Sequence, residues 1–295
     1  HASYRRQRQM CIRDRFQRVH DLSWAAGDAQ AKGFLIGATS GRTTLNGEGL
    51  QHQDGHSHIL SSTIPNCLSY DPTYAYEVAT IVKDGIKKMY IDQENYFYYI
   101  TTINENYTHP EMPKDCEEGI IKGMYVLSDN ESYDVRLLGS GAILREALKA
   151  KDILFKFKIK AQVWSVTSFN LLRKDGMEIE RYNQLNPSGK QKLTYVEECF
   201  SDSNVPVIAA TDYMRSYAEQ IRPYIHSSYT TLGTDGYGRS DSRQTLRDFF
   251  EVDSKSIARA AIYALYKNDK IDKNQIENYY KELGIDSNKP NPWEI

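Results

Sequence analysis

The chain has 295 residues, of which 40% are hydrophobic and 26% are charged, and its formal net charge is -2. This length accommodates two domains of ordinary size, and the composition is typical of a folded globular protein. A net charge so close to zero gives no electrostatic reason to expect a nucleic-acid or membrane-surface partner. No apolar run approaches the roughly 18 residues that span a bilayer. We therefore expect no nucleic acid and no membrane among its partners.

Two further features bear on location and on the N-terminus. The four cysteines are far apart and form no CxxC pair, so we interpret them as reduced thiols of a cytoplasmic protein. Residues 1–15 contain five arginines and few apolar residues, with no signal-peptide core. We interpret them as a basic, poorly ordered leader or a foreign extension.

The first half of the chain predicts an α/β domain. Apolar spacing predicts a helix over residues 16–32, and short apolar runs predict strands at 33–37 and 66–70. Asp71-Pro72 predicts the start of a helix with an apolar stripe, and the aromatic, β-branched run at 96–102 predicts a strand. Strand, helix and strand in this order form a βαβ unit, which predicts a largely parallel sheet.

The second half predicts a separate α/β domain after a linker. Two prolines and the absence of periodicity place the linker at residues 108–118, and the second domain at 119–295. Four strands are predicted in this domain, with helical segments between them, at residues 135–139, 161–166, 205–210 and 230–233. Three helical segments at 242–250, 254–266 and 273–283 close the chain.

The loop at residues 37–58, GATSGRTTLNGEGLQHQDGHSH, separates the first two predicted strands. It contains five glycines and three histidines in 22 residues. A loop of this length inside a compact domain is usually functional. Ligands of parallel sheets bind beyond the carboxyl ends of strands, where this loop and the segment 104–107 both begin. We therefore expect the two loops to converge on one face and to form the candidate site.

Glu48 and His52 are the residues of this loop best suited to chemistry. In a helical turn their spacing of four would place them on one face, within reach of a hydrogen bond. A carboxylate beside an imidazole suits acid–base catalysis or the binding of a substrate anion. The alternative is a pair that only stabilises the loop. A metal triad of His52, His56 and His58 is a weaker alternative because no fixed carboxylate accompanies it. We expect no metal ligands here and structural hydrogen bonds from His56 and His58.

A second polar loop, GTDGYGRSD at residues 233–241, leads into a predicted helix. Arg239 on this glycine-rich turn has the chemistry to bind an anion. A rigid turn that places an interface fits the same residues equally well. The bend at 37–41 lacks the GxxxxGK[ST] pattern of a phosphate-binding loop.

Several of these segments together resemble a known family. They are WAAGD at 24–28, the loop at 37–58, ITTINENY at 100–107 and GTDGYGRSDSRQTLRDFFEVD at 233–253. They are similar to the homodimeric bacterial type of the first component of the pyruvate dehydrogenase complex, a thiamine-diphosphate-dependent enzyme. The resemblance runs from about residue 16 to 292, and residues 1–15 do not fit the family.

The resemblance implies an α/β fold in two parts. Residues 16–107 would be the later part of a thiamine-diphosphate-binding-fold (pyrimidine) domain, and residues 119–295 a transketolase C-terminal-like domain. The diphosphate-binding domain, its Mg2+ ligands and the glutamate that activates the cofactor would lie outside this chain. The chain alone is therefore expected to be inactive.

The resemblance also implies a reaction and its partners. Glu48 and His52 match active-site residues of the family that line the substrate pocket. With thiamine diphosphate and Mg2+, the family decarboxylates pyruvate oxidatively and transfers the acetyl group to lipoyl groups of dihydrolipoamide acetyltransferase. Its sites lie between two subunits, which implies a homodimer. Two alternatives are a non-catalytic dimerisation or docking fragment, and another thiamine-dependent 2-oxo acid dehydrogenase or transketolase-like enzyme.

Overall fold

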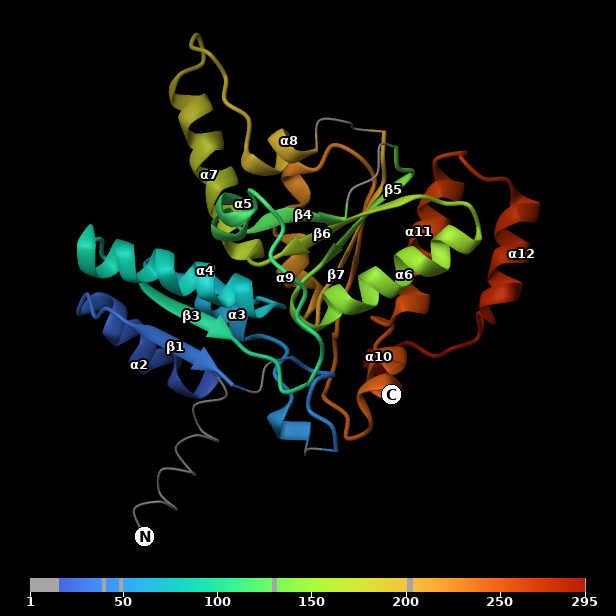
Figure 1. Cartoon of the computed structure of the whole chain (residues 1–295), viewed down its shortest axis with the longest axis horizontal. Helices are drawn as coiled ribbons and strands as arrows, with labels where there is room; N and C mark the ends of the chain where they lie inside the picture. Colours follow the sequence, from blue (N-terminus) through green and yellow to red (C-terminus); the bar gives the residue numbers. More distant parts are fainter. Residues whose placement is uncertain (1–15, 39–40, 48–49, 129–131, 201–203, 295) are drawn as a thin grey trace.

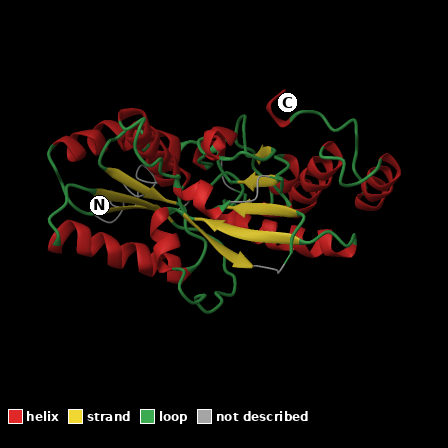
Figure 2. Cartoon of the chain, turned by 90° about the horizontal axis from the view of Figure 1, so that it is seen from above, coloured by secondary structure: helices red, strands yellow, loops and turns green. Residues whose placement is uncertain are grey.

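The computed structural model describes residues 16–38, 41–47, 50–128, 132–200 and 204–294, so the predicted leader at 1–15 lies outside the described residues. The described chain forms two sheets that lie side by side, each with helices on both faces (Figure 1, Figure 2). No described helix is long and apolar enough to cross a membrane.

The first sheet has three parallel strands in the order β1-β3-β2. They are β1 (Phe34–Gly37), β2 (Cys67–Tyr70) and β3 (Phe97–Thr101). Helix α4 (Ala75–Ile86), continued by the π-helical turn η2 (Lys87–Ile91), connects β2 to β3 and confirms the predicted βαβ unit.

The two faces of this sheet follow from the alternation of side chains along each strand. Tyr98 and Ile100 belong to the core beneath α4, whereas Phe97 and Tyr99 belong to the opposite core. That second core is closed by helices α2 (Phe16–Asp28) and α3 (Ser57–Ser61), each of which contributes an apolar side chain.

The predicted helix start at Asp71 is wrong by four residues, since α4 begins at Ala75. Asp71 instead joins the second sheet, where its backbone N–H donates to the Thr167 carbonyl at 2.7 Å. The Glu77 carboxylate accepts hydrogen bonds from the N–H groups of the two residues before Ala75, Thr73 and Tyr74. These bonds fix the start of α4 at Ala75, four residues after Asp71 has bonded to the second unit.

The second sheet has five strands in the order β4-β6-β5-β7-β8. They are β4 (Met124–Ser128), β5 (Val135–Gly139), β6 (Ala161–Val166), β7 (Val207–Ala210) and β8 (Tyr229–Leu232). The four predicted strands are confirmed and are parallel. The edge strand β4, antiparallel to β6, and the preceding helix α5 (Glu117–Lys122) were not predicted. Gly123, with a left-handed φ of 117°, ends α5 and leads directly into β4, so no turn sequence separates the two.

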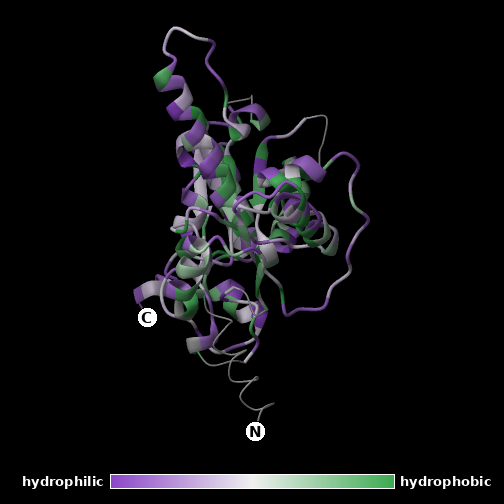
Figure 3. Cartoon of the chain, turned by 90° about the vertical axis from the view of Figure 1, so that its left-hand side faces the viewer, coloured by the Kyte–Doolittle hydropathy of each residue, from purple (hydrophilic) through white to green (hydrophobic). Residues whose placement is uncertain are grey.

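Helices cover both faces of this second sheet (Figure 1). One core lies beneath α6 (Leu144–Lys156), α11 (Ser254–Lys267) and α12 (Lys273–Leu283). The other lies beneath α7 (Phe169–Leu185), α8 (Tyr195–Cys199) and α9 (Arg215–Glu219). Figure 3 shows hydrophobic residues gathered along the strands in the interior and hydrophilic residues in the outer loops. The short helix α10 (Arg243–Phe249) follows β8, and the turns η3 (Gly141–Ile143), η4 (Arg222–Tyr224) and η5 (Pro292–Glu294) complete the fold.

Candidate active site

The candidate site is the loop between β1 and α3, which leaves the carboxyl end of β1 as predicted. Of the two predicted catalytic residues, Glu48 lies outside the described residues, so its pairing with His52 stays a prediction. His52 ends a single 3-10 turn, η1 (Leu50–His52), and is half-buried. No hydrogen bond or ion pair joins the His52 imidazole to any other residue that the structure describes.

The residue that follows His52 fixes this turn to the second sheet. Gln53 is 5% exposed. Its Oε1 accepts a hydrogen bond from the Arg239 N–H at 2.7 Å, and its Nε2 donates to the Arg239 carbonyl. The Arg239 guanidinium lies over the Phe249 ring, 5.4 Å from its centroid. These contacts hold the turn at 233–241 against the histidine loop, as the interpretation of a rigid turn expects.

The beginning of the loop is held by one buried carboxylate, that of Asp212 after β7. It accepts hydrogen bonds from the Thr43 N–H at 3.0 Å and from the Thr44 hydroxyl at 2.9 Å. Burial raises the pKa of Asp212, although Arg247 and the two threonines act in the opposite direction. Gly41 has a φ of 83°, and a Cβ there would lie 2.1 Å from Asp212 Oδ2, so this approach requires glycine.

Helix α10 brings the two predicted loops together. Arg243 donates to the Thr44 carbonyl at 2.7 Å and to the Asn104 carbonyl, which belongs to the segment after β3. One turn later, Arg247 donates to Glu105 Oε2 at 2.7 Å. The predicted convergence of the two loops on one face is therefore confirmed, and two arginines of the second unit link them.

His58 has a structural role, as predicted. It is fully buried, its Nε2 lies 3.2 Å from the Thr101 hydroxyl, and its ring stacks on Tyr217 with centroids 4.8 Å apart. Burial lowers the pKa of His58 to about 3. The imidazole is therefore neutral at physiological pH, and it belongs to the core between the loop and α9.

His56 lies at the start of α3 beside Asp54. Its Nδ1 is 3.7 Å from Asp54 Oδ1, and its side chain is 45% exposed. Burial acts to raise the pKa of Asp54, but hydrogen bonds from His56 and Ser57 outweigh it and lower that pKa. Among the described residues, no group of three or more His, Cys, Asp or Glu is arranged to hold a metal ion.

A buried carboxyl group near the candidate site was not predicted as such. Asp71 accepts hydrogen bonds from the Thr101 hydroxyl at 2.7 Å and from the Ser140 hydroxyl at 2.5 Å, which belongs to the second unit. Burial raises the pKa of Asp71 to about 7. The Asp-Pro pair looks like a helix start in the sequence, and no local signal shows that the carboxyl group joins two sheets.

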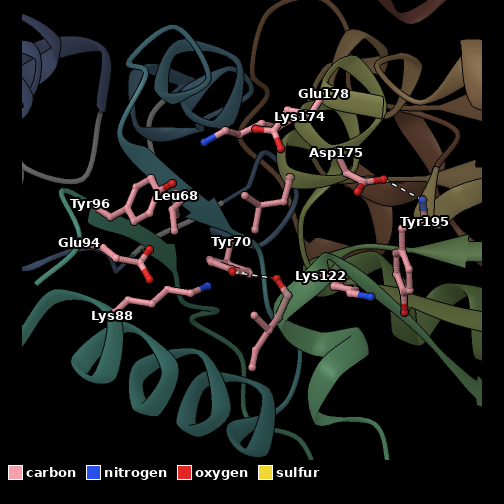
Figure 4. Close-up of a pocket in the computed structure, with 12 residues that line it drawn as sticks. Leu68, Tyr70, Lys88, Glu94, Tyr96, Lys122, Lys174, Asp175, Glu178 and Tyr195 are labelled. Atoms are coloured by element: carbon pink, nitrogen blue, oxygen red, sulfur yellow. Dashed lines mark hydrogen bonds between the residues drawn. The ribbon is translucent and has the colours of Figure 1, made fainter. Parts of the chain in front are cut away.

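A cleft of about 260 Å³ lies elsewhere, between β2, η2, α5 and α7. Figure 4 shows Lys88, Lys122 and Lys174 around Tyr70, whose hydroxyl donates to the Ile121 carbonyl. Acidic side chains, including Asp175, line the same cleft, and none of its lining residues belongs to the histidine loop. The loop therefore remains the candidate active site.

Two family models match this chain, one for each sheet. The model described as pyruvate dehydrogenase E1 component middle domain matches residues 11–110, which contain the first sheet. The model described as transketolase-like TK C-terminal domain matches residues 123–253, which contain the second. A transketolase from Pichia stipitis superposes with a TM-score of 0.63 at 17% identity, over 86% of this chain and 34% of its own. At that identity the likeness shows the fold alone, and it agrees with the predicted transketolase-like class.

Curated relatives extend the match over nearly the whole chain. The pyruvate dehydrogenase E1 component of Pseudomonas aeruginosa is 57% identical over 282 residues, which are 94% of this chain and 32% of that protein. The Escherichia coli protein of the same name is 54% identical over the same shares. This chain therefore belongs to the pyruvate dehydrogenase E1 component family, and it spans about a third of the length of the curated relatives that it matches.

Proposed function

We propose that this chain forms the His52 loop and the transketolase C-terminal-like part of a pyruvate dehydrogenase (acetyl-transferring) subunit. The whole subunit would decarboxylate pyruvate oxidatively with thiamine diphosphate and transfer the acetyl group to lipoyl groups of dihydrolipoamide acetyltransferase. The names of the relatives support this class of reaction. The observation that carries the proposal is the half-buried His52, whose imidazole has no partner among the described residues and whose turn is fixed through the next residue, Gln53, to the loop after β8.

The described residues fit one wall of such a site better than its metal-binding part. His52 offers one ring nitrogen as a donor and one as an acceptor, which suits contact with a substrate oxygen. In the described part of the chain, no cluster of acidic, histidine or cysteine side chains would hold Mg2+. From the family resemblance we assign the main ligands of thiamine diphosphate and Mg2+ to protein outside this chain, and we expect the chain alone to be inactive. When bound, thiamine diphosphate supplies the carbanion chemistry, which the protein orients.

In this proposal His52 hydrogen-bonds an oxygen of the substrate or moves a proton at one ring nitrogen, and Glu48 orients the bound substrate. Exclusion of water around the half-buried ring would strengthen both contacts. The two loops joined by Arg243 would hold this wall of the pocket in place.

We further propose a homodimer in the cytoplasm, built from units at residues 16–107 and 119–295 with a connection at 108–118. Exposed apolar side chains of the first unit support a further protein contact. Leu22 and Trp24 of α2 are 73% and 46% exposed, and Ile36 of β1 is 48% exposed.

The test is the substitution His52→Ala in a full-length protein that contains this segment. We expect overall complex activity to fall by about 100-fold or more, the usual contribution of a positioned acid–base group. The thermal unfolding midpoint should not change, because the ring has no partner in the described chain. The matched control is His56→Ala in the same loop, which should keep activity within about twofold of the parent. Activity within twofold for His52→Ala would overturn the catalytic assignment.

A further inference from the structure

The geometry points to a positioning role for the glycine-rich turn at residues 236–239: it sets the place of the His52 imidazole, and Gln53 transmits that placement. This inference rests on the proposed function of His52. It also assigns a role to the second polar loop, at residues 233–241, which the proposed function does not explain.

The first observation is the two-point bond between Gln53 and the turn. The acceptor and the donor of one side-chain amide both bond to the backbone of one residue, Arg239, 186 positions away in the sequence. A single hydrogen bond leaves rotation free, whereas two bonds from one planar amide also fix orientation. Gln53 directly follows His52, so fixing the amide limits how far the imidazole can move.

The second observation is the close approach of the turn to the other end of η1. A Cβ placed on Gly238 would meet Gln53 Oε1 at 2.8 Å and the Leu50 carbonyl oxygen at 2.8 Å. Leu50 is the first residue of the 3-10 turn that ends at His52, and Gln53 follows it; the Gln53 N–H closes the turn by donating to the Leu50 carbonyl at 3.3 Å. The turn that bears His52 therefore sits directly on Gly238, and any side chain there would push it away.

The third observation is that the turn at residues 236–239, which we call the seat of His52, is itself held in place by hydrogen bonds. Arg42 Nη1 donates to the Gly236 carbonyl at 2.6 Å, and the Thr234 hydroxyl donates to the Asp212 carbonyl at 2.9 Å. Asp212 also holds the beginning of the histidine loop through Thr43. The seat and the loop thus share one support at the end of β7, so the second sheet sets the position of His52 relative to the rest of the site.

The role differs from catalysis because neither residue is placed to touch a substrate in this proposal. Gln53 is 5% exposed, with both ends of its amide bonded to Arg239, and glycine has no side chain. Both act through His52. Misplacement of a reacting group by about 1 Å can cost about 100-fold in rate, so a loosened seat should lower turnover while the fold is retained.

The experiment uses Gln53→Glu and Gly238→Ala in the full-length protein. The carboxylate introduced at position 53 can still accept from the Arg239 N–H but cannot donate to the carbonyl. We expect kcat at saturating pyruvate to fall by about tenfold or more in each variant, with KM changed by less than about threefold. Tyr237→Ala is the matched control, because Tyr237 lies in the same turn and is 86% exposed. It should retain full turnover.

A double substitution separates positioning from a general structural effect. If Gln53 acts through His52, then Gln53→Glu should cost nothing further in the His52→Ala background. An equal cost in both backgrounds would overturn the inference while leaving the role of His52 intact. His52→Ala without effect would instead overturn the proposed function. Hydrogen exchange tests the seat without any activity: Gly238→Ala should speed exchange at the Arg239 and Gln53 amides, and unchanged rates would show that no such seat exists.

Discussion

His52 and His58 occupy one loop, six residues apart, in opposite environments. His52 is half-buried, and its imidazole has no partner among the described residues, whereas His58 is fully buried against Thr101 and Tyr217. The difference arises after the 3-10 turn, where α3 carries His58 into the core beneath α9 while Gln53 holds His52 at the edge of the second sheet. Whether a histidine in this loop is half-buried or fully buried therefore depends on the segment that covers it, not on the local sequence.

The largest effect on stability should come from the buried histidine. His58→Ala removes a ring that contacts Tyr217 and leaves a cavity between α3 and α9, which should lower the free energy of unfolding by about 3 kcal/mol. The corresponding change at His52 should leave that free energy nearly unchanged. Urea unfolding of the two variants measures the contrast. A loss below about 1 kcal/mol for His58→Ala would show that the loop tolerates the cavity and that the two histidines differ less than the structure indicates.

The pH dependence of stability sharpens the contrast, since His58 lies 3.9 Å from Asp71 and the two groups act in opposite senses. Burial raises the pKa of Asp71 from 3.8 to about 7 and lowers the pKa of His58 from 6.5 to about 3. Between about pH 4 and pH 6.5 the native state keeps a proton on Asp71 that the unfolded chain releases, so this contribution to stability falls as the pH rises. Over the same range the unfolded chain binds a proton that native His58 does not, so that contribution rises.

Asp71→Asn removes only the first contribution, and the amide resembles the neutral carboxyl group that the folded state favours. The free energy of unfolding of this variant should rise more steeply with pH between pH 4 and pH 6 than that of the parent. The difference in slope should approach one proton, about 1.4 kcal/mol per pH unit. Urea unfolding at several pH values measures it. Parallel curves for the variant and the parent would contradict a protonated Asp71 in the folded state.

The smallest effect should come from His56, whose side chain is 45% exposed and only near Asp54. His56→Ala keeps the backbone N–H that donates to Asp54 Oδ1, so the start of α3 should be retained. The change in the free energy of unfolding should be about 0.5 kcal/mol or less. The same urea measurement detects it, and a loss comparable to that of His58→Ala would mean that the ring, not the backbone, holds the loop.

Much of the fold could be predicted from the sequence because the periodicity of apolar residues is a local property. The βαβ unit from β2 to β3 and the parallel strands of the second sheet follow from runs that each form one element. Strand β4 and helix α5 were not predicted from the sequence because Gly123 joins them without a turn sequence. The start of α4 was misplaced because Asp71 bonds to the second sheet, and a residue's neighbours in sequence do not show such a bond.

For the candidate site, the sequence by itself determined the loop, its place at the carboxyl end of β1, its convergence with the segment after β3 and, through resemblance, the choice of Glu48 and His52. Only the tertiary structure decided that His58 is buried and that the turn at 236–239 forms the seat beneath His52. The physical reason is the range of the interactions. Helices and strands are set by side chains a few residues apart, whereas the Gln53–Arg239 pair joins residues 186 positions apart, and such contacts exist only after both sheets have folded and docked.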